Sequence, residues 1–302
     1  MYKKLLVVFV GLGLIALQSF AQNLSQLQHN LKHLVSSFRG EVGIAVIYEG
    51  KDTITVNNGA HYPMMSVFKF HQAIAVAQEL QRRNIPLDSM IYVKKRDLLS
   101  GTYSPLRDKY PEGNRNFKIS ELLTYTLQLS DNNACDILFD HVVDVKHTDA
   151  ALRFLGTVDF AIVAAEREMN ANSQLCYANW TTPLAATKLL DDFVRGSVLY
   201  GRYYEFVLQT MLACTIGQRR LPSGLPRAVR IGHKTGTSGL NERGEYVGVN
   251  DIGFVFLPDG RRYSVSVFVK DSKESVIICE DLIAKISKEV FNCLSKKEKH
   301  AR

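Results

Sequence analysis

The apolar positions near the start of the chain follow two different periods. Between residues 24 and 38 they recur at alternating steps of three and four, which predicts an amphipathic helix that ends near Gly40. These positions are Leu24, Leu27, Leu31, Leu34 and Phe38. Residues 42–48 and 53–56 are runs of β-branched and apolar residues separated by Glu49-Gly50-Lys51-Asp52, a pattern that predicts a β-hairpin.

Helical periodicity dominates the middle of the chain, and strand-like runs return near its end. Helices are predicted over residues 67–83, 119–128, 132–143, 182–193 and 203–212, with polar or Gly- and Pro-containing loops between them. Residues 252–257 and 263–269 flank Pro258-Asp259-Gly260, which predicts a second hairpin. A final helix is expected from about residue 273 to residue 292.

This order of elements predicts an α+β fold. Strands from both ends of the chain would form one antiparallel sheet flanked by helices, with an all-helical part inserted between them. We expect a discontinuous α/β subdomain of residues 22–60 and 213–295, and a helical subdomain of residues 61–212. The first and final helices should pack side by side on the sheet, and a cleft between the subdomains is a common place for a ligand site.

The N-terminal residues have the composition of an export signal. Lys3 and Lys4 precede an apolar run from residue 5 to residue 17, and Ser19-Phe20-Ala21 matches a small-x-small cleavage site. We therefore interpret residues 1–21 as a signal peptide and expect a soluble protein secreted to a bacterial periplasm. The alternative is an uncleaved membrane anchor, which the short apolar run disfavours because a span needs roughly 20 residues.

Composition excludes several other classes of function. The chain has 302 residues, of which 46% are hydrophobic and 22% charged, as in ordinary globular proteins. Part of the net charge of +7 comes from a basic tail at residues 296–302, so we expect no nucleic-acid partner. The five cysteines form no C-x-x-C pair and the eight histidines have no zinc-ligand spacing, so we expect no metal or other cofactor. We also expect a monomer with no stable membrane association after cleavage.

Three short motifs carry candidate chemistry. In Ser66-Val67-Phe68-Lys69, a spacing of three on a helix places the amine beside the hydroxyl, which can activate it as a nucleophile. By itself this motif is common by chance. Ser130-Asp131-Asn132 lies at a loop-to-helix junction, where the same residue types also serve as helix caps. Lys234-Thr235-Gly236 is followed by Thr237, and it could otherwise be a polar strand end with a turn glycine.

Taken together and in this order, the three motifs resemble the signature set of the class A serine β-lactamases and penicillin-binding proteins. The resemblance to class A β-lactamases extends over nearly all of residues 22–302. It implies an enzyme that hydrolyses the β-lactam amide of penicillins or cephalosporins through a serine acyl-enzyme and so confers antibiotic resistance. It also implies the same two-part fold that the hydrophobic pattern predicts.

The resemblance further implies roles for residues of the reaction. Ser66 would be the nucleophile, with its backbone N–H and that of Thr237 stabilising the oxyanion. Ser130 would pass a proton to the lactam nitrogen under the influence of Lys69 and Lys234. Either Lys69 or Glu166 would remove the proton from Ser66, and the sequence leaves this choice open.

Other positions match the family's loops and substrate contacts. The segment Glu166-Arg167-Glu168-Met169-Asn170 is similar to the Ω loop, whose acid and amide hold the hydrolytic water. Tyr103 would form an aromatic wall, Asn132 would bind the substrate's side-chain amide, and Thr235, Gly236 and Thr237 would bind its carboxylate with Lys234. Arg220 is the candidate for a supporting arginine, and Arg243 is the competing one.

Two positions depart from the family pattern. Ala164 and Asn179 occupy the places where many relatives have an arginine and an aspartate that brace the Ω loop, so that salt bridge should be absent. Residues 241–248 resemble relatives that favour cephalosporins.

Two rival functions are disfavoured. A penicillin-binding D,D-peptidase is disfavoured by Glu166 and Asn170, and a β-lactam sensor is disfavoured by the lack of a visible membrane relay.

Overall fold

The computed structural model describes residues 21–296. The predicted signal peptide lies outside this range except for its last residue, and the predicted basic tail lies outside it except for Lys296. No helix within the described range combines the length and the apolar character that a membrane span requires.

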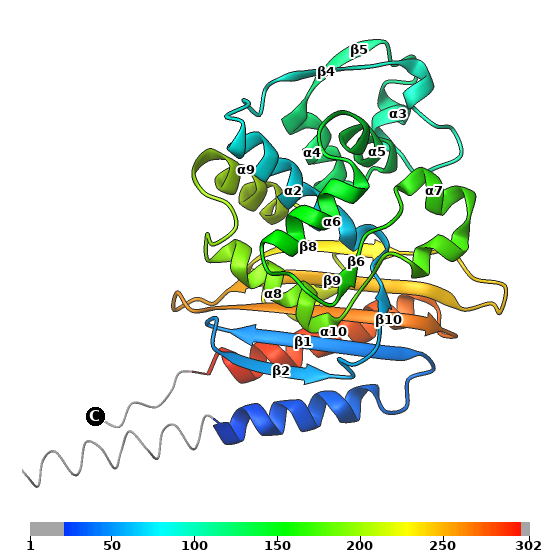
Figure 1. Cartoon of the computed structure of the whole chain (residues 1–302). Coiled ribbons are helices and arrows are strands. Elements are labelled where there is room, and N and C mark those ends of the chain that lie inside the picture. Colours follow the sequence, from blue (N-terminus) through cyan, green and yellow to red (C-terminus); the bar gives the residue numbers. More distant parts are fainter. Residues whose placement is uncertain (1–20, 297–302) are drawn as a thin grey trace, which may run out of the picture.

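A five-stranded antiparallel sheet is built from both ends of the chain (Figure 1). The strand order is β2-β1-β10-β9-β8. The strands are β1 Glu41–Tyr48, β2 Asp52–Val56, β8 Arg230–Thr237, β9 Tyr246–Phe256 and β10 Arg262–Ser272. The central pairing joins β1 to β10, with Glu41 opposite Lys270 and Tyr48 opposite Tyr263. The predicted antiparallel sheet is thus confirmed, and so is the α+β fold class.

Two helices cover one face of this sheet (Figure 1). The first runs over residues 21–35, and α10 (Val276–Leu294) is the last element of the fold. Their apolar stripes, which include Leu31 and Ile283, pack with Val255 and Val267 of the sheet in one buried cluster. The first and last helices therefore lie in one cluster on the sheet, as predicted. This packing is favourable because it removes the apolar stripes of both helices from water.

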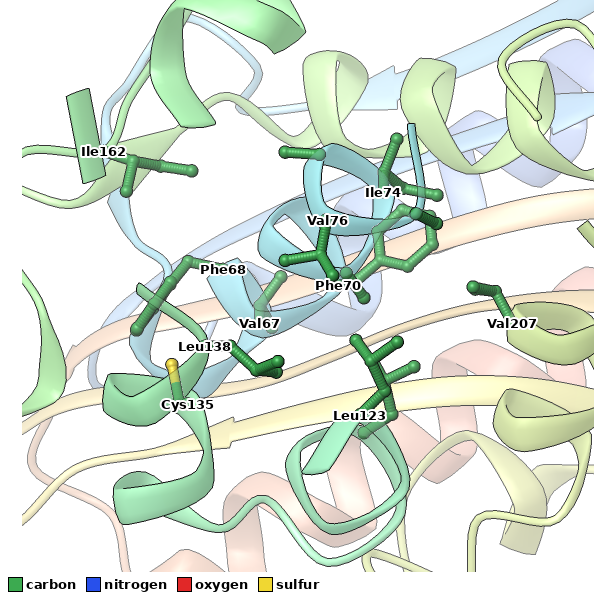
Figure 2. Close-up of a cluster of buried hydrophobic side chains, with 14 of the residues drawn as sticks. Val67, Phe68, Phe70, Ile74, Val76, Leu123, Cys135, Leu138, Ile162 and Val207 are labelled. Atoms are coloured by element: carbon green, nitrogen blue, oxygen red, sulfur yellow. The ribbon is translucent and has the colours of Figure 1, made fainter. Parts of the chain in front are cut away.

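The remaining helices lie on the other face of the sheet (Figure 1). They are α2 Phe68–Arg82, α3 Pro105–Lys109, α4 Ile119–Gln128, α5 Asn132–His141, α6 Val145–Phe154, α7 Glu166–Ala171, α8 Pro183–Val194 and α9 Gly201–Leu212. Helix α2 is buried on nearly all sides, and Figure 2 shows its Phe70 and Ile74 among side chains that include Leu123 of α4 and Val207 of α9. Its buried positions include the polar residues Lys69, His71 and Gln72 beside the apolar ones.

Short elements complete the chain and position the loops. The 3₁₀ helices are Met65–Val67, Lys95–Asp97, Ser173–Tyr177 and Leu221–Gly224. Strands β3 Tyr62–Pro63, β7 Trp180–Thr181 and β6 Phe160–Ala161 form one small sheet, and β4 Met90–Val93 pairs with β5 Arg115–Lys118. The β3–β7 pairing joins the chain just before Ser66 to the end of the segment that contains Glu166.

The predicted helices agree with the structure to within a few residues, but several elements were not predicted, among them strand β8 and helices α3, α6 and α7, and one predicted strand is too short. Helix α6 was not predicted, and only Thr148 and Leu152 are buried in it. Strand β9 starts at Tyr246, six positions before the predicted residue 252, because Asn250 and Asp251 interrupt the apolar run. Both polar side chains are buried and hydrogen-bonded, which lets the strand continue through them.

Candidate active site

Ser66 lies on a tight turn between β3 and α2. The 3₁₀ turn Met65–Val67 contains it, and Met65 has a positive φ of 47°, an uncommon conformation for a residue with a side chain. Strand β8 approaches this turn closely at Gly236. A Cβ atom on Gly236 would lie 2.6 Å from the Met64 carbonyl oxygen and 3.2 Å from the Ser66 nitrogen, so only glycine fits there.

Lys69 is fully buried below Ser66 and is surrounded by oxygen atoms. Its Nζ lies 3.0 Å from Ser66 Oγ, 2.7 Å from the Ser130 carbonyl oxygen and 2.6 Å from Asn132 Oδ1. It also lies 2.8 Å from Glu166 Oε1, and Ser66 Oγ is 3.4 Å from the same carboxylate oxygen. The predicted contact between Ser66 and Lys69 is therefore present, and Glu166 joins both.

Asp131 orients the two residues on either side of it. It is the N-cap of α5, where its carboxylate accepts hydrogen bonds from Ala134 N at 2.8 Å and Leu106 N at 2.6 Å. The carboxylate also accepts a bond from Ser104 Oγ at 3.0 Å, and burial raises the pKa of Asp131. Ser130 takes a positive φ of 57° just before this cap. Asp131 thus does cap a helix, as the alternative interpretation of this motif held. The cap also fixes Ser130 and Asn132 over Lys69.

Lys234 is a second buried lysine, located on β8. Its Nζ donates to Ser130 Oγ at 2.9 Å and to the Thr235 carbonyl oxygen at 2.8 Å. Burial, followed by the positive charge of Lys69, lowers the pKa of Lys234 to about 7. The Ser130 hydroxyl therefore contacts an amine whose charge changes near neutral pH.

Glu166 is held by a residue that the sequence did not indicate. Asp136 of α5 is buried, and its two carboxylate oxygens accept the backbone N–H groups of Glu166 and Arg167, each at 2.9 Å. The Arg167 side chain covers this carboxylate and also bonds Asp140 at 2.6 Å. Burial raises the pKa of Asp136 to about 7. Such a buried anchor leaves no motif in the sequence, because it acts on backbone groups.

These elements enclose a cleft of about 570 Å³. Nine of the predicted site residues line it: Ser66, Tyr103, Ser130, Asn132, Glu166, Asn170, Arg220, Thr235 and Thr237. Lys69 and Lys234 lie buried behind its hydroxyl groups, and Gly236 is packed against the turn that bears Ser66. Tyr103 is 58% exposed. The fold therefore brings all twelve predicted residues to one place.

Comparison with known proteins decides the family. The model of the beta-lactamase enzyme family matches residues 26–294. A β-lactamase of Bacteroides uniformis is 36% identical over 91% of this chain and 93% of its own length, and β-lactamase VEB-1 of Pseudomonas aeruginosa is 35% identical over 96% and 97%. The crystal structure of a class A β-lactamase from Bacteroides cellulosilyticus superposes with a TM-score of 0.86 at 36% identity, over 91% of this chain and 98% of that one. The chain belongs to the class A β-lactamases.

The solved structure of the extended-spectrum β-lactamase TLA-1 is also similar, at 40% identity and a TM-score of 0.88, over 90% of this chain and 99% of that one. The enzyme described here thus hydrolyses β-lactams and acts in antibiotic resistance, as predicted. The D,D-peptidase and sensor alternatives are set aside.

The neck of the Ω loop in this β-lactamase is closed by an amide. Asn179 Oδ1 accepts the backbone N–H groups of Val163 at 2.8 Å and Ala164 at 3.0 Å, and its Nδ2 donates to the Ala164 carbonyl oxygen at 2.8 Å. Asn179 is fully buried. The expected absence of an arginine–aspartate bridge between positions 164 and 179 follows from the residues present, and neutral backbone hydrogen bonds replace that bridge.

The structure also separates the two candidate arginines of the β-lactamase. Arg220 is 3% exposed and lines the cleft, where it donates to Thr237 Oγ1 at 2.7 Å and to the Gly236 carbonyl oxygen at 3.0 Å. Arg243 points elsewhere, because it pairs with Glu245 at 2.8 Å and its side chain is 67% exposed. The geometry favours Arg220.

A further contact joins the Ω loop to the sheet. The Tyr177 hydroxyl donates to Asp271 Oδ1 at 2.5 Å, and Asn241 Nδ2 donates to the same hydroxyl at 3.3 Å. Asp271 is on β10 and has a positive φ of 48°. Because Tyr177 and Asn241 both line the cleft, this contact fixes one of its walls. Sequence reasoning did not identify it.

Proposed function

We propose that this β-lactamase acts through an acyl-enzyme on Ser66. The Ser66 oxygen attacks the β-lactam carbonyl carbon and its proton passes to Lys69 or Glu166, both of which contact Ser66 Oγ. The backbone N–H groups of Ser66 and Thr237 stabilise the oxyanion. When the lactam C–N bond breaks, Ser130 gives its proton to the nitrogen and takes one back from its lysine neighbours.

Hydrolysis of the ester is assigned to Glu166 and Asn170. The carboxylate of Glu166 takes a proton from a water molecule as that water attacks the acyl carbon, and Asn170 helps to orient the water. The bond between the acyl carbon and Ser66 Oγ then breaks, Glu166 returns the proton to Ser66 Oγ, and the product acid leaves. One observation above the others supports this assignment. Glu166 and Ser66 line the same cleft, and the Glu166 carboxylate oxygen lies 3.4 Å from Ser66 Oγ.

Binding of the substrate is assigned to the rest of the cleft. Asn132 bonds the side-chain amide of the antibiotic and Tyr103 packs against it. Lys234, Thr235 and Thr237 bind its carboxylate, and Arg220 supports Thr237 through their 2.7 Å hydrogen bond. Because the similar TLA-1 is named an extended-spectrum enzyme, we include cephalosporins with penicillins as substrates, which a panel of hydrolysis rates would test.

The test of the mechanism is the substitution Glu166→Ala in protein spanning residues 22–302. With nitrocefin, we expect one covalent equivalent on Ser66 to accumulate and steady turnover to fall at least about 100-fold, because general base catalysis contributes about that much. Intact mass spectrometry measures the adduct. Glu168→Gln is the matched control, since Glu168 is an exposed acid on the same loop whose 2.7 Å hydrogen bond from Ala165 N an amide oxygen can keep, and it should allow steady turnover. Unchanged turnover in Glu166→Ala would refute the role of Glu166.

We also propose that residues 1–21 direct export and are removed, which places the enzyme in the periplasm as a monomer. The mass of the protein recovered from a periplasmic extract tests the cleavage, and sedimentation tests the monomer. An uncleaved chain in the membrane fraction would contradict the proposal.

A further inference from the structure

An arginine that does not line the cleft holds the loop that bears Tyr103. The loop comprises residues 99–104, and Arg107 follows it in the short helix α3. Arg107 Nη1 donates to three carbonyl oxygens of the loop, those of Leu99 at 2.7 Å, Ser100 at 2.9 Å and Thr102 at 2.7 Å. Hydrogen bonds from a charged donor are about twice as strong as neutral ones. This one group therefore fixes much of the backbone of the loop.

The other side of the guanidinium bonds an exposed carboxylate. Arg107 Nε and Nη2 donate to Asp108 Oδ1 at 3.1 Å and 2.8 Å. The side chain of Arg107 is 21% exposed and that of Asp108 is 64% exposed. Because an ion pair in contact with water contributes little, the Asp108 carboxylate is not needed to keep Arg107 on the loop.

The loop in turn orients the side-chain amide of Asn132. Asn132 Nδ2 donates to Thr102 Oγ1 at 2.7 Å, and Asn132 Oδ1 accepts a hydrogen bond from Lys69 Nζ at 2.6 Å. Because an ammonium group only donates, these two bonds determine which end of the amide is the oxygen. One Nδ2 hydrogen and one Oδ1 lone pair remain for a ligand in the cleft, which Asn132 lines.

The backbone joins the loop to Asn132 a second time. The Asn132 N–H donates to the Tyr103 carbonyl oxygen at 3.1 Å. A displacement of the loop would therefore move the Thr102 hydroxyl, Tyr103 and Asn132 together.

We propose that Arg107 is a positioning residue that sets the preference of the enzyme for β-lactams with a side-chain amide. With its carbonyls held by Arg107, the loop keeps the Thr102 hydroxyl on Asn132 Nδ2, and the second Nδ2 hydrogen faces the carbonyl oxygen of the substrate amide. This role rests on the proposed function, in which Asn132 binds that amide. A substrate without the amide gains nothing from this contact, so its hydrolysis depends less on Arg107.

A purely structural role for Arg107 leads to a different result. If Arg107 only stabilised the fold, its loss would lower the amount of active enzyme and reduce the hydrolysis of all substrates in the same proportion. The ratio of kcat/KM for two substrates does not depend on the amount of active enzyme. This ratio therefore separates positioning from stability.

The experiment measures kcat/KM of the full-length enzyme for benzylpenicillin and for 6-aminopenicillanic acid, which has the same fused rings and carboxylate but no side-chain amide. In Arg107→Ala, the ratio of the first value to the second should fall at least about fivefold, because a small displacement of a positioned group can cost about 100-fold. Asp108→Ala is the matched control, since it removes the other partner of the guanidinium, and its ratio should stay within about twofold of that of the unaltered enzyme. An unchanged ratio in Arg107→Ala, or an equal fall in both variants, would overturn the proposal.

Arg107→Gln covers the case in which the alanine variant does not fold, which circular dichroism would show. Glutamine keeps a polar side chain but is too short to reach the three carbonyl oxygens. We therefore expect the same direction of change in the ratio, and an unchanged ratio in folded Arg107→Gln would count against the role of Arg107.

Thr102→Val tests the route through the hydroxyl, because valine has nearly the same shape and accepts no hydrogen bond. If Arg107 acts through Thr102, adding Arg107→Ala to Thr102→Val should lower the ratio by less than about twofold further. Full additivity of the two effects would contradict this route.

Asn132→Ala distinguishes failure of this role from failure of the proposed function. We expect the ratio to fall at least about tenfold in this variant, because the bond to the substrate amide is lost. A fall in Asn132→Ala without a fall in Arg107→Ala would refute the positioning role alone. No fall in Asn132→Ala would refute the assignment of the substrate amide to Asn132, and the role of Arg107 with it.

Discussion

Lys234 shows how one side chain acquires its properties from its surroundings. An amine in water keeps its charge far above neutral pH, but burial of Lys234 and the nearby charge of Lys69 lower its pKa to about 7. Ser130 contacts both lysines: its hydroxyl lies 2.9 Å from Lys234 Nζ, and its carbonyl oxygen accepts a hydrogen bond from Lys69 Nζ at 2.7 Å. The charge that we assign to binding of the substrate carboxylate therefore decreases as the pH rises through about 7.

This loss predicts the alkaline side of the pH profile. For nitrocefin, kcat/KM should decline as the pH rises above about 7, because the pKa of Lys234 in the free enzyme is lowered. Lys234→Arg keeps its charge at all working pH values, so we expect its decline to begin at least about one unit higher. Initial rates between pH 5.5 and 9 measure both profiles. Coincident alkaline limbs would show that another group controls this side.

At the scale of elements, the Ω loop is held at both ends by groups that bond the backbone. Asp136 binds the start of α7, and Asn179 closes the neck through Val163 and Ala164. A buried hydrogen bond contributes about 1 kcal/mol net, and an unsatisfied buried partner costs more. The position of Glu166 therefore depends on two residues that do not line the cleft.

Asn179→Ala tests this dependence. Loss of three backbone hydrogen bonds should lower the free energy of unfolding by about 2–4 kcal/mol, and it should lower kcat more than the rate of acylation, because the hydrolytic step needs Glu166 in place. Denaturant unfolding and rapid-mixing kinetics measure the two effects. Asn172→Ala is the control, since Asn172 is exposed and accepts one hydrogen bond on the same loop, from Gln174 N. Equal behaviour of both variants would contradict a bracing role for Asn179.

At the scale of the whole molecule, the central sheet contributes to two buried clusters. Phe254 and Phe268 face the layer of helices that includes α2, whereas Val255 and Val267 face α10. Successive residues of a strand point to opposite faces, so neither cluster can form without the sheet. The two predicted subdomains share this layer, although their boundaries remain a prediction.

We therefore expect cooperative unfolding of the described fold. Leu123→Ala in one cluster and Ile283→Ala in the other should each lower the free energy of unfolding by about 2–5 kcal/mol. Both side chains are fully buried. Circular dichroism and Trp180 fluorescence should report one coincident transition in each variant, and Ile278→Ala at an exposed position of α10 should change it little. Two separate transitions, each shifted by only one substitution, would show independent subdomains.

Local patterns were sufficient to predict much of this protein. The pairing of Ser66 with Lys69 follows from helical spacing, and the strands and helices follow from apolar periodicity, because both are determined by residues close in sequence. Three motifs in order identified the family, whose resemblance then supplied Glu166 and Arg220. Nothing local distinguishes Glu166 from an ordinary surface acid.

The tertiary structure decided the remaining features. The sequence alone determined which elements form and which short motifs carry reactive groups. Only the fold placed Glu166 beside a serine 100 residues away, lowered the pKa of Lys234, and chose Arg220 over Arg243. It also brought His233 of β8 to Asp251 of β9. The physical reason is that distances and burial between segments remote in sequence depend on packing, which no local pattern records.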